Sequence, residues 1–312
     1  MRVHFEPDCF INNSYLTTYV VVLSKLVEIS TLQVLCFYNG GCMNPNKDLW
    51  EKGDFTKIAA TMGDSGEALV AGISKRLPMR ALDLGCGDGT TALPLARFGA
   101  EVLGVDIASN LVEAGNRRAA AEGVHNIHFQ EGDACKLDGV PDASFDLTLS
   151  VFGAMFAPRP FDVAQEMVRV TKPGGQIVMG NWIPNDPTSF VSQVLRISSA
   201  FVPPPPEGFI SPMTWGVEAN VLERFGKAGI AETNIKMVKD TFWFVAPLTE
   251  QQFIDLFKNY YGPTMNAFEA ATKNGKEHEL LTQLVDLTRT QNKATDGTVK
   301  IGATFLKVTV SR

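Results

Sequence analysis

Short apolar runs alternate with longer amphipathic segments from residue 80 onward. The amphipathic segments predict helices that end near Phe98, near Gly123 and before the Pro173-Gly174-Gly175 stretch. Such alternation is typical of βαβ units, so we expect an α/β fold built on a parallel sheet. The apolar runs predict strands over residues 81–84, 102–105, 127–130, 145–151 and 176–181.

The pattern changes after residue 182. Pro184, Pro187 and the run 203–206 predict a stiff, extended excursion that covers a site and does not extend the sheet. Thr249 is then expected as the N-cap of a helical insertion that precedes the last strand. The later elements are expected as a helix over 218–227, a strand near 241–246, helices over 249–293 and a closing strand over 303–310.

The composition is that of a globular protein. Hydrophobic residues make up 45% of the 312 residues, charged residues make up 20%, and the formal net charge is −6. This acidic balance, without a run of Lys or Arg, disfavours nucleic acid as a partner, because most nucleic-acid binding rests on positive charge. The cysteines show no CxxC pair and no metal-type spacing, which predicts reduced thiols, a cytoplasmic location and no metal site. They are Cys9, Cys36, Cys42, Cys86 and Cys135.

The first 42 residues do not share this pattern. Residues 15–38 are apolar, but Lys25, Glu28 and Gln33 interrupt every run before the ~20 residues that a membrane span needs, so we expect no spanning helix. Element-like patterning begins only at "NPNKDLWEKGDF". Two interpretations stay open: residues 1–42 are an N-terminal extension outside the native fold, with Met43 as the true start, or they belong to the native chain.

Three glycines at alternate positions, Gly85, Gly87 and Gly89, follow the first predicted strand and precede a helix. Glycines there let the turn adopt positive φ and let a ligand lie against the backbone, which predicts a nucleotide-like ligand. The dinucleotide fingerprint G-x-G-x-x-G/A fails when counted from Gly85 but fits when counted from Gly87, so the spacing leaves NAD open. Asp83, two residues before the turn, would repel a pyrophosphate and favours a ligand with a cationic end.

Further motifs follow the glycine turn in order along the chain. The series is "DLGCGDGT" (83–90), "GVD" (104–106), "EGDA" (131–134), "FDLTLS" (145–150) and "KPGG" (172–175). In this series the chain resembles the class I S-adenosylmethionine-dependent methyltransferases, over about residues 50–182. Within that class it is similar to the small-molecule branch that includes the ubiquinone and menaquinone biosynthesis C-methyltransferases.

The resemblance implies an enzyme with S-adenosyl-L-methionine as its cofactor. It also implies a Rossmann-like doubly wound, seven-stranded, mostly parallel sheet with an antiparallel last strand, and a helical insertion that forms a substrate lid. We expect residues 43–312 to form a single methyltransferase domain with its core over 80–182. Substrate and lid elements are expected over 43–79, 183–217 and 247–300.

Residues at the ends of the predicted strands are the expected cofactor contacts. Asp106 ends the second strand, where its carboxylate would accept both ribose hydroxyls. By the resemblance, Asp133 accepts from the adenine amino group, the Ala134 amide meets the ring, and Asp83 faces the methionine ammonium. For each Asp the alternative is a simple helix N-cap. The full predicted set is Asp83, Gly85, Cys86, Gly87, Asp106, Ile107, Asp133, Ala134 and Ser150.

The residues after the fourth predicted strand, "LSVFGAMF" (149–156), bear on the acceptor. They lack the Asn/Asp-Pro-Pro-aromatic signature of enzymes that methylate exocyclic amines, which disfavours such an acceptor. Several apolar residues are candidates for an acceptor pocket, with the hydrophobic core as the alternative place for most of them. They are Phe152, Met155, Phe156, Trp182, Phe201, Trp215, Trp243 and Phe244.

We therefore expect methyl transfer from S-adenosylmethionine to a small-molecule acceptor, aromatic or apolar. Methyl transfer from a sulfonium needs alignment more than a base, so no catalytic residue is assigned. Tyr260 and Tyr261 are candidates for deprotonating or orienting the acceptor. Two alternatives stay open: an NAD-dependent oxidoreductase with a Rossmann fold, and an S-adenosylmethionine-binding module without turnover.

Overall fold

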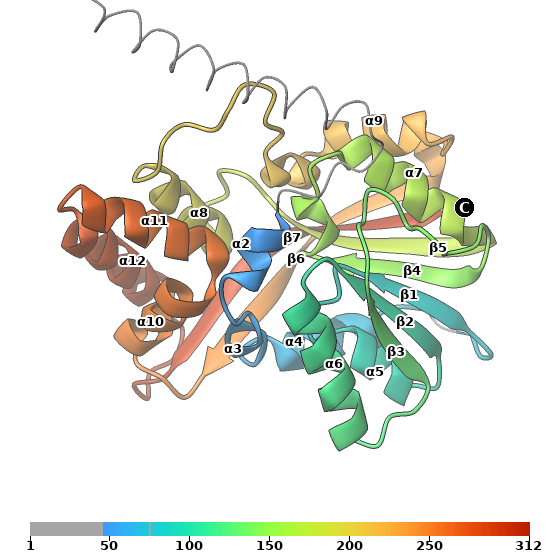
Figure 1. Cartoon of the computed structure of the whole chain (residues 1–312), viewed down its shortest axis with the longest axis horizontal. Coiled ribbons are helices and arrows are strands. Elements are labelled where there is room, and N and C mark those ends of the chain that lie inside the picture. The colour runs from blue at the N-terminus through green and yellow to red at the C-terminus, as the bar shows by residue number, and fades with distance from the viewer. Residues whose placement is uncertain (1–45, 75) are drawn as a thin grey trace, which may run out of the picture. The chain divides into compact units, whose positions relative to one another are not determined.

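The computed structural model describes residues 46–74 and 76–312 (Figure 1). At its centre is a seven-stranded sheet in the order β3-β2-β1-β4-β5-β7-β6. β1 to β5 pair in parallel, and β7 runs antiparallel between β5 and β6, so the predicted mostly parallel sheet with an antiparallel last strand is confirmed. The strands are β1 (Arg80–Leu84), β2 (Glu101–Asp106), β3 (Ile127–Glu131), β4 (Phe145–Val151), β5 (Thr171–Trp182), β6 (Ile235–Ala246) and β7 (Val299–Ser311).

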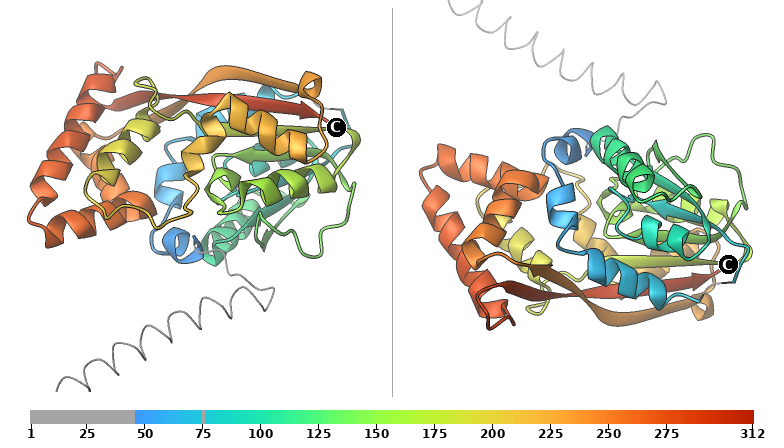
Figure 2. Two further views of the ribbon diagram at one scale, coloured as in Figure 1. Left: turned by 90° about the horizontal axis from the view of Figure 1, so that it is seen from above. Right: turned by 90° about the horizontal axis from the view of Figure 1, so that it is seen from below.

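Helices cover both faces of this sheet, as a doubly wound fold requires. Figure 2 shows α4 (Gly63–Ala71), α5 (Ala92–Arg97) and α6 (Ser109–Ala121) on one face. The opposite face carries α7 (Pro160–Val170) and α9 (Glu218–Lys227). The middle strands β1 and β4 are buried almost throughout, which explains why their sequences are continuous apolar runs rather than alternating ones.

Four further helices pack on one another beyond the ends of β6 and β7 (Figure 1), and we call them the helical cap. The predicted N-cap is confirmed, because the Thr249 side chain accepts from the Gln252 N–H while the Gln252 side chain accepts from the Thr249 N–H. Three of the four helices lie between β6 and β7, so the predicted helical insertion is confirmed. The cap consists of α8 (Phe190–Ser199), α10 (Glu250–Tyr260), α11 (Gly262–Lys273) and α12 (Glu277–Gln291).

Two short N-terminal helices, α2 (Lys47–Glu51) and α3 (Thr56–Ala59), lie between the helical cap and α6 (Figures 1 and 2). Three 3-10 turns complete the elements of the described residues: η1 (Ala154–Phe156), η2 (Pro212–Gly216) and η3 (Glu232–Asn234). The predicted extension over residues 1–42 lies outside the described residues.

Two strands are longer than the apolar pattern predicted. β5 begins at Thr171 rather than at residue 176, because the Lys-Pro-Gly-Gly stretch pairs irregularly with β4 where the register shifts. β6 begins at Ile235 rather than near 241. Its first half is an edge strand whose side chains are mostly exposed and include Lys and Asp, so it has no apolar alternation, yet its backbone pairs with β7 throughout.

Thr91 occupies the predicted N-cap position of α5, but its side chain does not cap the helix. Its hydroxyl donates instead to the Asp83 carboxylate at 2.6 Å. Threonine is a favoured N-cap residue, so the sequence predicts Thr90 or Thr91 as the cap of this helix, and that prediction is wrong for Thr91. The first turn of α5 does not need the Thr91 hydroxyl as an acceptor, because the Leu93 N–H donates to the Gly89 carbonyl at 3.0 Å and Pro94 has no N–H.

Candidate active site

A cavity opens where β1, β2 and β4 end at their carboxyl termini and where α2, α3 and the helical cap face the sheet. It contains about 1140 Å³ of space between atoms, part of it open to solvent. Open α/β sheets bind ligands at this edge, because the strand ends and the loops that follow them diverge there. The cavity has two chemically different halves.

The first, the glycine half, is built from the turns that follow β1, β2 and β3. Its lining residues are Leu84, Gly85, Cys86, Gly87, Asp88, Thr90, Thr91, Val105, Asp106, Ile107, Leu111, Gly132 and Ala134. The second, the aromatic half, is built from the residues after β4, the end of β5, and the α2, α3 and cap segments. Its lining residues are Asn46, Trp50, Phe55, Ile58, Met62, Val151, Phe152, Gly153, Ala154, Phe156, Ala157, Trp182, Val191, Phe242, Phe257 and Tyr261.

The glycine turn owes its shape to the close backbone approach of Gly85 and Gly153. Gly85 has φ +69°, and a Cβ there would lie 2.7 Å from the Cα of Gly153. A Cβ on Gly153 would in turn lie 2.1 Å from the Gly85 carbonyl oxygen. Gly87 differs, because its φ is +55° but a Cβ there would meet nothing within 4 Å. The backbone at Gly87 therefore faces open space, and a ligand can lie directly against it.

Asp106, the last residue of β2, holds this turn in place. Its carboxylate accepts hydrogen bonds from the backbone N–H of Gly87 at 2.8 Å and of Ala108 at 2.9 Å. Burial raises the pKa of Asp106 above its ordinary value, and the backbone hydrogen bonds oppose that shift. Because the residue also lines the cavity, its remaining oxygen lone pairs can accept hydrogen bonds from a ligand.

Two more carboxylates flank the turn. Burial raises the pKa of Asp83 to about 7, although the hydrogen bond from Thr91 opposes the shift. Asp88 lies 3.6 Å from Arg118, yet its buried Oδ1 has no hydrogen-bond partner among the described residues, and burial raises its pKa as well. The glycine turn is thus surrounded by poorly compensated acceptors, which favours the cationic end of a ligand.

Most of the predicted cofactor residues line the cavity: Gly85, Cys86, Gly87, Asp106, Ile107 and Ala134. Asp83, Asp133 and Ser150 do not. Asp133 accepts from the backbone N–H of Cys135 at 2.8 Å. Ser150 donates to the Leu84 carbonyl at 2.6 Å and accepts from the Ala154 N–H at 3.0 Å, so it joins β1 to the turn after β4. Direct ligand contact by these three residues stays a prediction.

The aromatic half contains a tight ring stack. Phe152 and Trp182 lie face to face with ring centroids 3.5 Å apart and an interplanar angle of 6°. Phe152 has φ +61°, an uncommon conformation for a bulky residue, which here directs the chain after β4 around the cavity. Trp50 of α2 contacts the Phe156 ring edge-on at 4.9 Å. No charged side chain lines this half among the described residues, so it suits an apolar, planar molecule.

Tyr261, between α10 and α11, lines the aromatic half. Its ring packs against Trp50 at 5.9 Å and Phe257 at 5.5 Å. Burial raises its pKa above the ordinary value of a tyrosine, so the phenol stays protonated at neutral pH and donates hydrogen bonds rather than acting as a base. Tyr260 does not line the cavity. Of the two tyrosines, Tyr261 is therefore the one placed to orient an acceptor.

The predicted acceptor-pocket residues divide between the cavity and the core. Phe152, Phe156 and Trp182 line the cavity. The others do not: Met155, Trp215 and Phe244 are buried in the core, and Phe201 and Trp243 are half-buried elsewhere. Within the excursion and lid element predicted over 183–217, residues 190–199 form the helix α8, whose Val191 lines the cavity, while residues 200–217 contribute no lining residue.

Sequence reasoning missed several lining residues on α2, α3, α8, β6 and α10. They are Asn46, Trp50, Phe55, Ile58, Met62, Val191, Phe242 and Phe257. The available signal was the stretch "DLWEKGDF", in which two aromatic residues stand within a short polar segment. Segments of this kind are too short to show helical periodicity.

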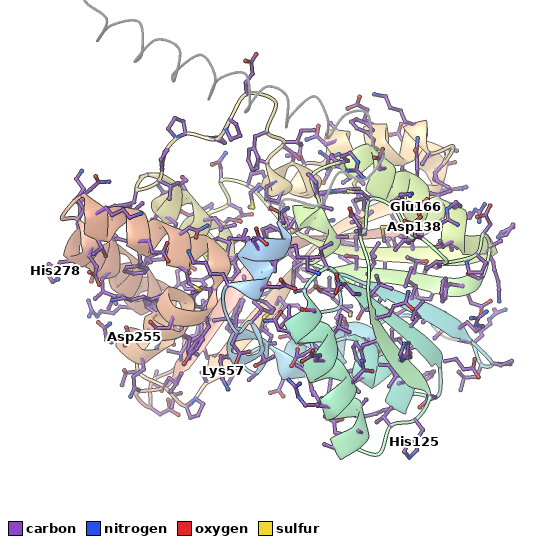
Figure 3. The ribbon with its side chains drawn as sticks, in the orientation of Figure 1. Lys57, His125, Asp138, Glu166, Asp255 and His278 are labelled. Atoms are coloured by element: carbon purple, nitrogen blue, oxygen red, sulfur yellow. The ribbon has the colours of Figure 1, made fainter. Side chains whose placement is uncertain are left out.

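The described histidines lie away from the cavity. Figure 3 shows His125 and His278 at the periphery of the molecule, and both are exposed, as is His128. In the part of the chain that the structure describes, no group of three or more His, Cys, Asp or Glu side chains is placed to hold a metal ion. No helix in that part is both long and apolar enough to cross a membrane.

The glycine half fits an adenosyl ligand with a cationic end. Gly87 leaves room for a ligand against the backbone, Asp106 offers a carboxylate to hydroxyl groups, and Asp88 has a buried oxygen without a partner. A pyrophosphate would be repelled by the same acids. The fold and the site therefore define the class: a Rossmann-like α/β protein that binds a nucleoside ligand without a phosphate.

Comparison with known proteins identifies the family. Residues 82–179 match the methyltransferase domain family. The uncharacterized protein Rv1405c of Mycobacterium tuberculosis is 32% identical over 244 residues, which cover 78% of this chain and 86% of that protein. The demethylmenaquinone methyltransferase of Geobacillus kaustophilus is 39% identical over 102 residues, which cover 32% of this chain and 43% of that protein.

Two solved structures share the fold. The YcgJ protein of Bacillus subtilis aligns with a TM-score of 0.50 and 20% identity, covering 80% of this chain and 98% of that chain. An N-methyltransferase of Haemonchus contortus was solved with phosphomonomethylethanolamine and S-adenosylhomocysteine. It aligns with a TM-score of 0.54 and 16% identity, covering 85% of this chain and 59% of that chain. The match to the methyltransferase domain shows that the chain belongs to the class I S-adenosylmethionine-dependent methyltransferases, so S-adenosylmethionine is its cofactor. It is thus an enzyme, and neither the NAD-dependent oxidoreductase nor the binding module without turnover is retained.

Proposed function

We propose that the chain methylates a small, apolar, aromatic molecule bound in the aromatic half of the cavity. One observation carries this proposal: the aromatic half, without a charged lining side chain among the described residues, adjoins the glycine half where Gly85 meets Gly153. A molecule in the first half and a methyl donor in the second would therefore share one cavity. The Phe152–Trp182 stack supports a planar acceptor, because aromatic rings pack favourably on such a surface.

In this proposal the glycine half holds the methyl donor. Asp106 accepts from the ribose hydroxyls, and the backbone at Ala134 contacts the adenine, with Asp133 accepting from its amino group. The carbonyls of Gly85 and Gly87 accept from the methionine ammonium. Asp83 does not line the cavity, so its negative charge acts on the ammonium through the field around the turn.

When bound, S-adenosylmethionine supplies an activated methyl group on a sulfonium. The chain's own contribution is to orient the acceptor and exclude water, and orientation of this kind lowers a barrier by ~7–11 kcal/mol. The Tyr261 hydroxyl, kept protonated by burial, donates a hydrogen bond that fixes the acceptor. The aromatic half has no carboxylate, amine or imidazole among its described lining residues, so no such group of this half serves as a base for the acceptor.

Transfer of a labelled methyl group to a panel of acceptors tests the proposal. The panel pairs hydroxylated and thiol-bearing naphthalenes with their sulfonated counterparts, and adds charged aliphatic amines. We expect transfer to neutral aromatic members and at least tenfold slower transfer to the sulfonated ones, because a buried sulfonate would have no partner in this half. Transfer to the charged aliphatic amines alone would contradict the proposal.

A cavity variant separates the two halves. Phe156→Ala removes part of the aromatic wall and leaves the glycine half unchanged. It should lower kcat/KM for the aromatic acceptor roughly tenfold while the Kd of S-adenosylhomocysteine stays within about twofold of wild type. Equal losses in both quantities would show that this residue does not belong to a separate acceptor site.

A further inference from the structure

The helix α9 buries an arginine on its apolar face. Val221, Arg224 and Phe225 are its buried residues, and their spacing places them one turn apart on the same side of the helix. Arg224 is only 4% exposed, although arginine is almost never buried to this degree without a paired acid. The guanidinium is therefore part of the packing of α9 and not of the solvated surface.

The guanidinium of Arg224 stacks on the ring of Trp215 in η2, with its central carbon 4.5 Å from the ring centroid. Its Nη2 donates to the Thr214 hydroxyl at 2.6 Å, and that hydroxyl donates in turn to the Ser211 carbonyl at 2.6 Å. Its Nη1 is buried and has no hydrogen-bond partner among the described residues. The stack thus fixes the orientation of the guanidinium and leaves one terminal nitrogen without an acceptor.

Trp215 carries a second unpaired donor in the same stack. Its side chain is completely buried, and its Nε1 has no hydrogen-bond partner in the part of the chain that the structure describes. Indole and guanidinium groups are donors only, so neither can satisfy the other. Buried polar groups in folded proteins are nearly always hydrogen-bonded, and two neighbouring N–H groups here need an acceptor from outside the stacked pair.

The charge of Arg224 also lacks a partner. No carboxylate of the described residues forms an ion pair with it, and its sequence neighbour Glu223 pairs with Lys227 at 2.8 Å. Burial lowers the pKa of Arg224 to about 10, which leaves the group a cation at neutral pH. A buried cation without a counter-ion is costly, and the π face of the Trp215 ring offsets only part of that cost.

We propose that the Nη1 of Arg224 and the Nε1 of Trp215 bind a small monovalent anion of the chloride class between η2 and α9. An anion supplies both the acceptor that the two donors lack and the negative charge that the guanidinium lacks, whereas a water molecule supplies only the acceptor. The burial of both side chains limits the ligand to a small one. Multivalent anions such as sulfate are disfavoured, because removing them from water costs more.

The anion site supports a wall of the aromatic half from outside the cavity. η2 packs on the end of β5, since a Cβ on Gly216 would lie 2.0 Å from the Trp182 carbonyl oxygen. Trp182 lines the cavity and stacks on Phe152. Anion binding therefore stabilises the fold where η2 meets this strand end, and the inference depends on neither the cofactor nor the acceptor.

Thermal denaturation of the full, ligand-free chain tests the anion site. Sodium chloride replaces sodium gluconate at constant ionic strength, so that general screening of charge stays the same. The midpoint of the wild type should rise and saturate, with a gain of roughly 2–5 °C at ten times the dissociation constant. Arg224→Met keeps the apolar length of the side chain and removes its charge, so the midpoint of this variant should not respond to chloride.

Two further variants separate anion binding from a general loss of packing. Trp215→Phe keeps a ring under the guanidinium and removes the N–H, so its response should require at least about threefold more chloride. Arg196→Met is the matched control, because Arg196 is exposed on α8 and its Nε donates to the Gln193 side chain at 3.1 Å. This control should respond to chloride as the wild type does.

Anomalous scattering from crystals grown in sodium bromide gives a readout that needs no variant. We expect a bromide ion within hydrogen-bond distance of both Nη1 of Arg224 and Nε1 of Trp215. Water alone at these two nitrogens would overturn the anion site. The same follows if the wild-type midpoint is equal in chloride and gluconate, or if Arg224→Met keeps the full response.

Discussion

At the scale of single residues, buried carboxylates give the site its electrostatic character. Burial raises the pKa values of Asp83, Asp88 and Asp106 together, and Arg118 is the cation that pairs with one of them. Shifted carboxylates of this kind cluster at functional sites, where a charged ligand compensates the cost of burying them. In the proposed function, the ammonium and sulfonium groups of the cofactor supply the positive charge that these acids lack.

Asp106 is predicted to serve both the ligand and the turn. Asp106→Ala should weaken S-adenosylmethionine binding at least about tenfold, because at least one charge-assisted hydrogen bond to the ribose is lost. It should also lower the free energy of unfolding by roughly 1–3 kcal/mol, since the N–H groups of Gly87 and Ala108 lose their acceptor. Calorimetric titration and thermal denaturation measure the two effects. Unaltered affinity would remove Asp106 from the site.

Asp83 predicts a pH dependence of stability. Its folded pKa of about 7 lies above its ordinary value of 3.8, so the folded state binds more protons between these values. Stability of the ligand-free protein should therefore fall as the pH rises from about 4 to about 7 and level off above. The Asp83→Asn side chain still accepts a hydrogen bond from Thr91 but does not titrate. Between pH 5 and 7.5 the free energy of unfolding of the wild type should therefore fall by roughly 2 kcal/mol relative to that of this variant. If the free energies of unfolding of the wild type and of Asp83→Asn changed equally with pH, the raised pKa of Asp83 would be contradicted.

At the scale of elements, the site depends on two turns that meet without side chains. Gly85 after β1 and Gly153 after β4 are in backbone contact, and Ser150 fastens the same pair of strands by accepting and donating one hydrogen bond each. The turns form the boundary between the glycine half and the aromatic half. Their contact is therefore part of the geometry that aligns donor and acceptor.

Gly153→Ala should destabilise the fold. Its Cβ would lie 2.1 Å from the Gly85 carbonyl oxygen, and the clash is with backbone that cannot move aside cheaply. We expect a loss of about 1–3 kcal/mol in the free energy of unfolding, measured by chemical denaturation. Gly226→Ala on α9 is the control, because a Cβ there meets nothing within 4 Å, and this variant should be slightly more stable than wild type. Equal stability of both variants would contradict the close approach.

Gly87→Ala should fold and yet bind poorly. The added Cβ has open space in the ligand-free protein, and the positive φ of +55° costs about 1 kcal/mol for alanine. The same Cβ would project into the volume proposed for the ligand, so S-adenosylhomocysteine affinity should fall by at least about tenfold in a calorimetric titration. Wild-type affinity in this variant would show that the turn is only structural.

The sequence predicted those elements whose signals are local. The strands around the glycine turn, the helix 218–227 and the Thr249 cap follow from apolar runs and capping residues, and the structure confirms them. The first half of β6 was missed, because an exposed edge strand with Lys and Asp has backbone pairing but no apolar alternation.

The candidate site divides in the same way. The glycine half was predictable because its residues follow strands in fixed motifs. Most of the cofactor residues predicted from those motifs line the cavity. The aromatic half was only partly predictable. Phe257 and Tyr261 are close in the sequence, but Trp50 comes from a distant segment, and only tertiary packing brings its ring to that of Tyr261.

At the scale of the whole molecule, the sheet and the helical cap contribute different chemistry to one cavity. The sheet and its turns supply backbone, acids and half of the aromatic wall, and the segments of α2, α3 and the cap supply the other half of that wall. A cofactor bound in this cavity would lie between the sheet side and the α2 segment, whose Asn46 and Trp50 line it. Cofactor binding should therefore stabilise the α2 segment as well as the sheet.

S-adenosylhomocysteine should raise the thermal midpoint of the wild type. At a free concentration of 100 times Kd the linkage relation gives about 2.7 kcal/mol of added stability. NADH at the same concentration should give no shift, because the acids around the turn repel its pyrophosphate. Differential scanning calorimetry measures both, and a shift with NADH alone would contradict the ligand assignment.

A structure of the chain with S-adenosylhomocysteine tests the central claim most directly. The account predicts adenosine between Asp106 and Ala134, the methionine end along Gly85 and Gly87, and the sulfur facing the Phe152–Trp182 stack. Ligand bound outside this cavity, or with its sulfur turned away from the aromatic half, would contradict it.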